Sequence, residues 1–169
     1  MASAPSPLAV VSKGLLAGAL ATVVSYSLGR LLFGPLAPPE FLARRGPPPP
    51  HRIVTKFARG IFEVELTERQ HANWVWFTHF AYGGTWGLVY ALFQSTFHLP
   101  VLLHGLAYGA AVWVLGHFLL LPATKISAPA SRQPRSIAGR WFVVNLVWGV
   151  TQALLYAWLV PARPGRCRD

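Results

Sequence analysis

The chain has 169 residues, of which 53% are hydrophobic and only 12% are charged, and its formal net charge is +10. Soluble domains usually have about a quarter charged residues, so this composition indicates a protein in contact with lipid. No Asp, Glu, Lys or Arg occurs in residues 70–124, and a soluble fold of this size could not bury so much apolar surface. The basic residues lie mainly between apolar segments, which favours a role in membrane orientation over a nucleic-acid-binding surface.

The first apolar segment predicts a membrane span at about residues 10–33. Its uncharged centre lies between Lys13 and Arg30, whose side chains can reach the membrane surface while their stems stay in lipid. A cleaved signal peptide is the alternative, but the segment has neither an early positive charge nor a typical small-residue cleavage site. Gly14 and Gly18 have the spacing of small residues that let membrane helices pack closely.

Two segments with different patterns follow the first span. Residues 34–50 are rich in proline and predict an extended loop, partly in polyproline II conformation. In residues 51–62 apolar side chains recur at helical spacing, with Arg52, Lys56 and Arg59 on the other side. This pattern predicts an amphipathic helix, either lying on the membrane surface or packed beneath the spanning helices.

Three more spans are predicted at about residues 72–95, 100–121 and 141–160. Thr67 and Gln70 have the spacing of a capping box and predict the start of the first of these helices. The turn after it is short, so this helix and the next should form an antiparallel hairpin. The expected fold is therefore all-α: an integral membrane four-helix bundle with a short cytoplasmic interfacial helix, in one domain covering residues 1–169.

The distribution of Lys and Arg predicts the orientation. The loop between the first two spans and the loop between the last two share one side of the membrane. They carry Arg30, Arg44, Arg45, Arg52, Lys56, Arg59, Arg69, Lys125, Arg132, Arg135 and Arg140, whereas the other side carries Lys13, Arg163, Arg166 and Arg168. By the positive-inside rule both loops are cytoplasmic and both termini lie outside. Anionic lipid is the expected partner of the basic loops, and no nucleic acid is expected.

Glycines and aromatic residues repeat within the predicted spans. The pattern Tyr82-Gly83-x-x-x-Gly87-x-x-Tyr90-Ala91 returns as Trp148-Gly149-x-x-x-Ala153-x-x-Tyr156-Ala157. Parallel repeats of this kind occur in transporter folds, although chance similarity between glycine-rich helices is an equal alternative. The glycines expected to pack helices together are Gly14, Gly18, Gly83, Gly87, Gly105, Gly109 and Gly149. The less favoured interpretation is that glycines and aromatic residues line a substrate cleft.

Several polar side chains are expected in the interior of the bundle. They are His79, Tyr82, Trp86, Tyr90, His104, Asn145 and Gln152. His79 and His117 fall at similar depths on neighbouring predicted helices, so they are candidate ligands for haem or a transition metal. The favoured interpretation is that each makes a hydrogen bond across the bundle, and we expect no cofactor and no metal.

The sequence contains none of the familiar catalytic patterns. No P-loop, H-E-x-x-H or G-x-S-x-G motif is present. No carboxylate occurs within a predicted span, which argues against a carboxylate pathway for protons or cations. The single cysteine, Cys167, has no cysteine partner within the chain for a disulfide. We therefore expect no catalytic residue and no enzyme activity.

Taken together, these motifs resemble the YagU-like family of bacterial inner-membrane proteins. The resemblance covers roughly Arg52 to Leu159. It rests on Leu66-Thr67-x-x-Gln70, on His79-x-x-Tyr82-Gly83-x-x-x-Gly87-x-x-Tyr90, on a glycine-rich third helix with Trp113 that ends at Pro122, and on Trp148-Gly149. The family consists of small multi-span proteins with a domain of unknown function. The resemblance thus implies an architecture and a bacterial inner (plasma) membrane location, without a reaction or a ligand.

Three functions remain open from the sequence. The leading expectation is a non-enzymatic structural or interaction component of the cell envelope, which could form a homo-oligomer. The second is a small transporter or pore for an uncharged or anionic solute. The third is a membrane redox protein that binds haem or a metal through His79 and His117.

Overall fold

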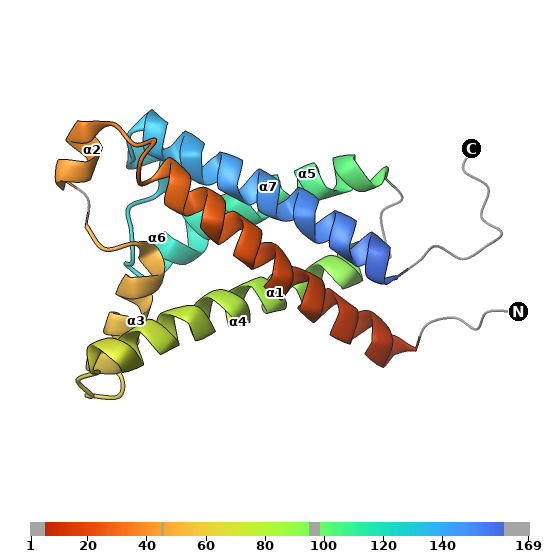
Figure 1. Ribbon diagram of the computed structural model, residues 1–169, viewed down its shortest axis with the longest axis horizontal. Coiled ribbons are helices and arrows are strands. Elements are labelled where there is room, and N and C mark those ends of the chain that lie inside the picture. The colour runs from red at the N-terminus through yellow and green to blue at the C-terminus, as the bar shows by residue number, and fades with distance from the viewer. Residues whose placement is uncertain (1–5, 45, 95–98, 161–169) are drawn as a thin grey trace, which may run out of the picture.

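The computed structural model describes residues 6–44, 46–94 and 99–160, and it is all-α: these ranges contain no strand (Figure 1). The start of the turn predicted at residues 98–100 and both chain ends, including the tail arginines and Cys167, lie outside the described residues. The elements in chain order are α1 (Pro7–Leu32), α2 (Pro39–Arg44), α3 (Pro49–Gly60), α4 (Glu68–Gln94), α5 (Val101–Val114), the π-helical segment η1 (Leu115–Leu120), α6 (Leu121–Ala123), the 3₁₀ turn η2 (Ala130–Arg132) and α7 (Arg135–Leu159).

Three helices are long and apolar enough to cross a membrane. They are α1, the continuous helix Val101–Ala123 and α7, with mean hydropathies of 1.8, 1.6 and 1.5. Helix α4 has 27 residues but does not reach the same hydropathy. Its apolar residues are interrupted by glycines, by Trp and Tyr side chains and by His79. Length and hydropathy thus support three of the four predicted spans.

Local sequence signals explain where several helices begin. The Ser6 hydroxyl accepts a hydrogen bond from the Ala9 amide at the start of α1 (3.2 Å). The capping box before α4 is confirmed, because the Thr67 amide donates to Gln70 Oε1 (2.9 Å) and the Gln70 amide donates to Thr67 Oγ1 (3.4 Å).

The proline-rich segment is more helical than expected. It contains α2, and α3 already begins at Pro49. Proline suits the first turn of a helix because its missing N–H would have no partner there and its φ angle is already helical. Helix α7 likewise begins at Arg135, well before the predicted start at residue 141.

The four long helices do not pack equally against one another. Helix α1 packs along both α4 and α7, and α5 packs along α7, whereas α4 and α5 approach each other at few points (Figure 1). The hairpin predicted between the second and third spans therefore differs from the structure, since the main neighbour of α4 is α1.

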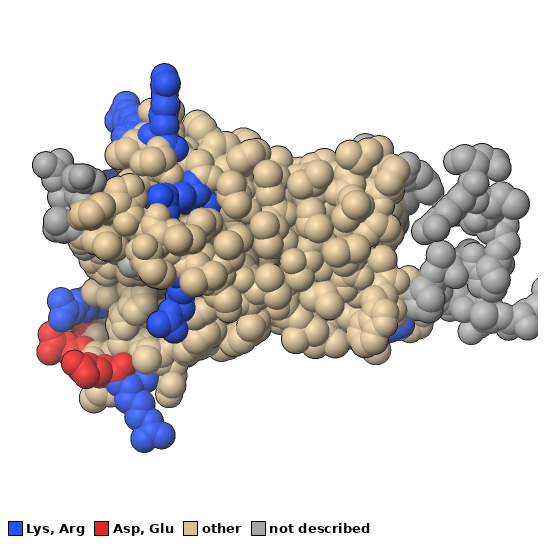
Figure 2. Space-filling view, turned by 45° about the horizontal axis from the view of Figure 1, so that its top comes forward, with Lys and Arg blue, Asp and Glu red and all other residues tan. Residues whose placement is uncertain are grey.

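Basic side chains gather at one end of the molecule, where α2, α3 and α6 also lie (Figures 1 and 2). Several of them donate hydrogen bonds to backbone carbonyl groups at this end. Arg140 donates to Leu32 O and Leu36 O, the latter at 2.9 Å, and so binds carbonyl groups at and just beyond the end of α1. Arg52 donates to Ile126 O (3.3 Å), and Lys56 donates to Thr124 O.

Helix α3 is packed rather than free. Val54 and Ala58 are buried, and the helix lies against α4. Ile53 is half-buried, and Phe57 is 47% exposed. Just after the helix, Ile61 is 63% exposed and Phe62 69%. Of the two arrangements considered for this amphipathic segment, packing against a long helix is observed.

Candidate functional site

Glycines form two close helix crossings. At the first, Gly14 and Gly18 of α1 meet Gly83 and Gly87 of α4. A Cβ atom on Gly14 would lie 2.7 Å from the Cβ of Ala91, and one on Gly18 would lie 2.8 Å from the Cα of Gly87. Carbon atoms in normal contact are about 3.5–4.0 Å apart, so the helices can approach this closely only because side chains are absent.

The second crossing joins α5 to α7 in the same manner. A Cβ atom on Gly105 would lie 2.7 Å from the Cα of Val150 and 3.0 Å from the Cβ of Ala153. A Cβ atom on Gly149 would lie 2.7 Å from the Cα of Gly109. The structure thus places all seven glycines of the sequence prediction at these two crossings.

The two crossings are alike in geometry but do not use equivalent positions of the sequence echo. Gly87 meets both Gly14 and Gly18, and Gly149 meets both Gly105 and Gly109, whereas the echo aligns Gly149 with Gly83. Tyr90 and Tyr156 do occupy equivalent positions, and their rings face each other with centroids 5.6 Å apart. The glycine contacts are thus shifted by four residues relative to the echo.

Aromatic side chains fill the space between α4 and α5. The Tyr108 hydroxyl donates to Trp86 O (2.5 Å), and Tyr90 Oη lies 3.0 Å from His104 Nδ1. Tyr90 and Tyr108 are 1% and 4% exposed, and their ring centroids are 5.0 Å apart. These two helices are therefore held together by side-chain hydrogen bonds and ring contacts instead of backbone contact.

One amide group in the interior lacks hydrogen-bond partners. Gln152 is fully buried, and neither its Nε2 nor its Oε1 atom bonds to another described residue. The Oε1 atom lies beside Gly18 of the first crossing. One turn earlier on α7, Trp148 Nε1 does have a partner, because it donates to Thr22 Oγ1 (3.4 Å).

The two candidate haem ligands lie on different interfaces. His79 packs against Tyr26 of α1 with ring centroids 5.3 Å apart, and its Nδ1 lies 3.2 Å from Val75 O. His117 lies in η1 and packs against Trp141 of α7 at 5.5 Å. The structure does not bring the two imidazoles together. Among the described residues, no group of three or more His, Cys, Asp or Glu side chains could hold a metal ion.

The remaining polar residues of the sequence prediction are dispersed. Asn145 Nδ2 donates to Trp141 O within α7 (2.8 Å). Tyr82 is 46% exposed and makes an edge contact with Trp86. The short π-helical segment around His117 has no signal in the sequence, and such segments often occur at functional positions.

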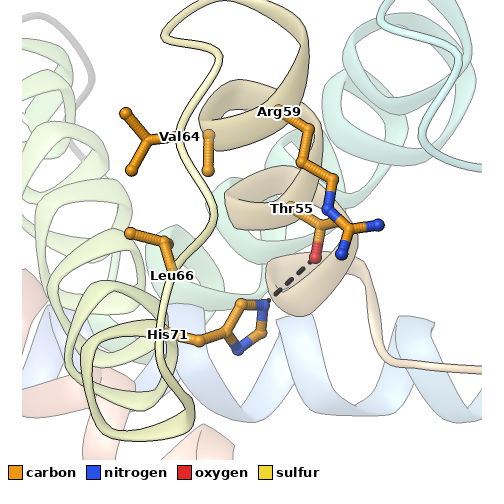
Figure 3. A pocket seen from close by; sticks show the side chains of 6 residues that line it. Thr55, Arg59, Val64, Leu66 and His71 are labelled. Carbon is orange, nitrogen blue, oxygen red and sulfur yellow. Dashed lines mark hydrogen bonds between the residues drawn. The ribbon is translucent and has the colours of Figure 1, made fainter.

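A small pocket between α3 and α4 was not anticipated from the sequence (Figure 3). It has a volume of about 70 Å³ and is lined by Thr55, Ala58, Arg59, Val64, Leu66 and His71. His71 Nε2 lies 3.1 Å from Thr55 Oγ1, and the His51 and His71 rings are 5.3 Å apart. The pocket arises because the chain reverses after Gly60, a feature that helical periodicity does not reveal.

These features define an all-α protein with several helices apolar enough to cross a membrane and an interior built from glycine crossings and aromatic rings. Residues 34–154 match the family described as "Protein of unknown function (DUF1440)", and the chain belongs to that family. No curated protein and no solved structure matches the chain. The whole of α1 lies outside the matched range, although α1 supplies half of the first crossing.

Proposed function

We propose that this chain is a non-enzymatic, multi-span protein of the bacterial inner membrane and a structural or interaction component of the cell envelope. Helices α1, α4, α5 and α7 form a four-helix bundle, and the chain is a YagU-like member of its family. The observation that carries the proposal is the nature of the interior, where glycine crossings and aromatic rings occupy the space between the helices. Tight backbone approach of this kind stabilises membrane helices against one another.

Helix α4 acts as the fourth span in this proposal. Its closest contacts are to α1, and one 27-residue helix is long enough to cross the hydrocarbon core. The Trp and Tyr side chains that lower its hydropathy suit the membrane interface and the packed interior.

Gene deletion and complementation test the structural role. We expect the deletion to sensitise cells to detergent, and we expect Gly18→Val not to restore resistance because it disrupts the first crossing. Gly29→Val adds the same side chain to α1 at a position where a Cβ atom would meet nothing within 4 Å, so it should restore resistance. If Gly18→Val restored resistance as well as Gly29→Val does, the function would not depend on the first crossing, and the proposal would be wrong.

The proposed topology places the basic loops in the cytoplasm and both termini outside. We expect a membrane-impermeant maleimide to label the native Cys167 in intact cells. In a Cys167→Ser background, Ser131→Cys, an exposed position in η2, should be labelled only after permeabilisation. Labelling of Ser131→Cys in intact cells would show that this loop lies outside, which is the opposite of the proposed orientation.

Helix α3 is proposed to rest on the cytoplasmic membrane surface. Its buried face contacts α4, while Phe57 of the helix and Ile61 and Phe62 just after it are exposed. Exposed aromatic and aliphatic residues beside basic side chains are typical of interfacial helices.

A solute transporter or pore is a second candidate, favoured by the two similar glycine crossings and by the unpaired amide of Gln152. Parallel repeats and polar groups at mid-membrane are features of transporters. An osmotic swelling assay on liposomes containing the purified chain tests this alternative. Glycerol entry faster than in protein-free liposomes, reduced by Gln152→Met, would support transport over the structural role.

A further inference from the structure

A groove lies on the outer surface of α1 at the basic end of the molecule. It has a volume of about 460 Å³ and is lined by Ser27, Arg30, Leu31 and Pro35. Arg30 is in the last turn of α1, where the apolar helix meets the basic loops. In the proposed topology this depth corresponds to the headgroup region of the cytoplasmic leaflet.

An apolar stripe leads into the groove along the same helix. Leu20, Val24, Ser27 and Leu31 follow one another at intervals of three or four residues, which places them on one face of α1. Leu20 is 44% exposed, Val24 45% and Leu31 52%. Helices α4 and α7 leave this face uncovered, so in a membrane it contacts acyl chains.

Arg30 differs from four other basic residues at this end because it has no hydrogen-bond or ion-pair partner among the described residues. Arg140, Arg52 and Lys56 donate to backbone carbonyl groups. Arg59 lies 3.6 Å from Glu65. The exposed Arg30 guanidinium therefore keeps its donors available for a ligand.

Together, the groove, the apolar stripe and the Arg30 guanidinium match the shape and charge of a phospholipid. A guanidinium group binds phosphate oxygens through two parallel N–H donors, and the adjoining stripe accommodates a hydrocarbon chain. We propose that this groove binds the headgroup phosphate of an anionic phospholipid, with an acyl chain lying along Leu20, Val24 and Leu31. Anionic lipids are abundant in the cytoplasmic leaflet, where they attract basic residues near the membrane.

Native mass spectrometry of the purified full chain tests the site with phosphatidylglycerol and phosphatidylcholine as probes. We expect phosphatidylglycerol to bind more tightly, and Arg30→Gln to weaken its binding about tenfold, as expected for the loss of a charge-assisted hydrogen bond. Arg132→Gln is the matched control, because Arg132 is an exposed arginine at the same end of the molecule. It should leave binding unchanged.

Two further measurements distinguish a phospholipid site from diffuse charge attraction and from a soluble-anion site. Ser27→Phe fills the groove while keeping Arg30, and it should also weaken phosphatidylglycerol binding. Inorganic phosphate at millimolar concentration should not displace the lipid, because it lacks the acyl chain. Equal losses for Arg30→Gln and Arg132→Gln would show diffuse charge attraction and overturn the site, and displacement by inorganic phosphate would identify a soluble-anion site instead.

The lipid site rests on the proposed membrane function, but its failure can be distinguished from failure of that function. Alkaline carbonate extraction of cell membranes reports insertion alone. A chain that stays in the pellet while Arg30→Gln binds lipid normally would refute the groove and leave the membrane assignment in place. A chain released by carbonate would refute both.

Discussion

Gly18→Val is expected to abolish the close approach of α1 to α4. A Cβ atom at this position would lie 2.8 Å from the Cα of Gly87 and 2.9 Å from Oε1 of Gln152, and it would also collide with Gly83 O. Two of these three neighbours are backbone groups, which cannot move without separating the helices. Overpacking of a close contact typically costs about 1–3 kcal/mol, and we expect a loss near the upper end, about 3 kcal/mol. Unfolding of the purified chain by SDS in mixed micelles measures it.

Gly29→Val is the matched control on the same helix. A Cβ atom at Gly29 would meet nothing within 4 Å, and valine is a better helix former than glycine in a helix interior. This variant should therefore be as stable as the native chain or slightly more stable. Equal loss in both variants would indicate a general effect of valine in α1 and would contradict the crossing as the cause.

Gln152→Met is expected to stabilise the protein. Methionine has a side chain of similar length and shape but carries no amide. The amide of Gln152 is fully buried without a hydrogen-bond partner among the described residues. An unsatisfied buried polar group costs about 1–3 kcal/mol, so its removal should raise the free energy of unfolding by about 1–2 kcal/mol. The same SDS titration measures the gain.

Gln133→Met provides the opposite case. Gln133 Nε2 donates to Ala128 O at 2.6 Å in the loop before α7, so its replacement removes a hydrogen bond and should lower stability by up to about 1 kcal/mol. A loss of stability in Gln152→Met would mean that the native amide binds water or a polar solute inside the membrane. That result would favour the transporter candidate.

Each half of the molecule contains a glycine crossing, but the contacts between the two halves differ. In each half two helices meet through glycine, α1 with α4 and α5 with α7. Between the halves, α1 packs closely against α7, while α4 and α5 are joined mainly by the side chains of Tyr90, His104 and Tyr108. In a repeated architecture these two contacts would be equivalent. Their inequality means that the α4–α5 contact depends on side chains, whereas the α1–α7 contact includes close backbone packing.

The sequence by itself determined the class of the protein and its local structure. Charge-free apolar segments predicted the spanning helices, because lipid excludes charge and requires the backbone to bond internally. The Thr67–Gln70 box predicted a helix start, because its hydrogen bonds involve only neighbouring residues. Glycine spacing identified the surfaces that could pack closely.

Only the tertiary structure decided which surfaces meet. Lipid tails are as apolar as leucine, so hydropathy cannot select a helix partner, and shape and hydrogen bonds make the selection. Nothing in the chain order indicated that Gly18 would meet Gly87, that Arg140 would bind carbonyl groups at and just beyond the end of α1, or that Tyr90 would face Tyr156. The similar depths of His79 and His117 suggested a pair, but depth does not specify which way a side chain points around the helix axis. The packing of α1 and α7 directs the two imidazoles to different interfaces.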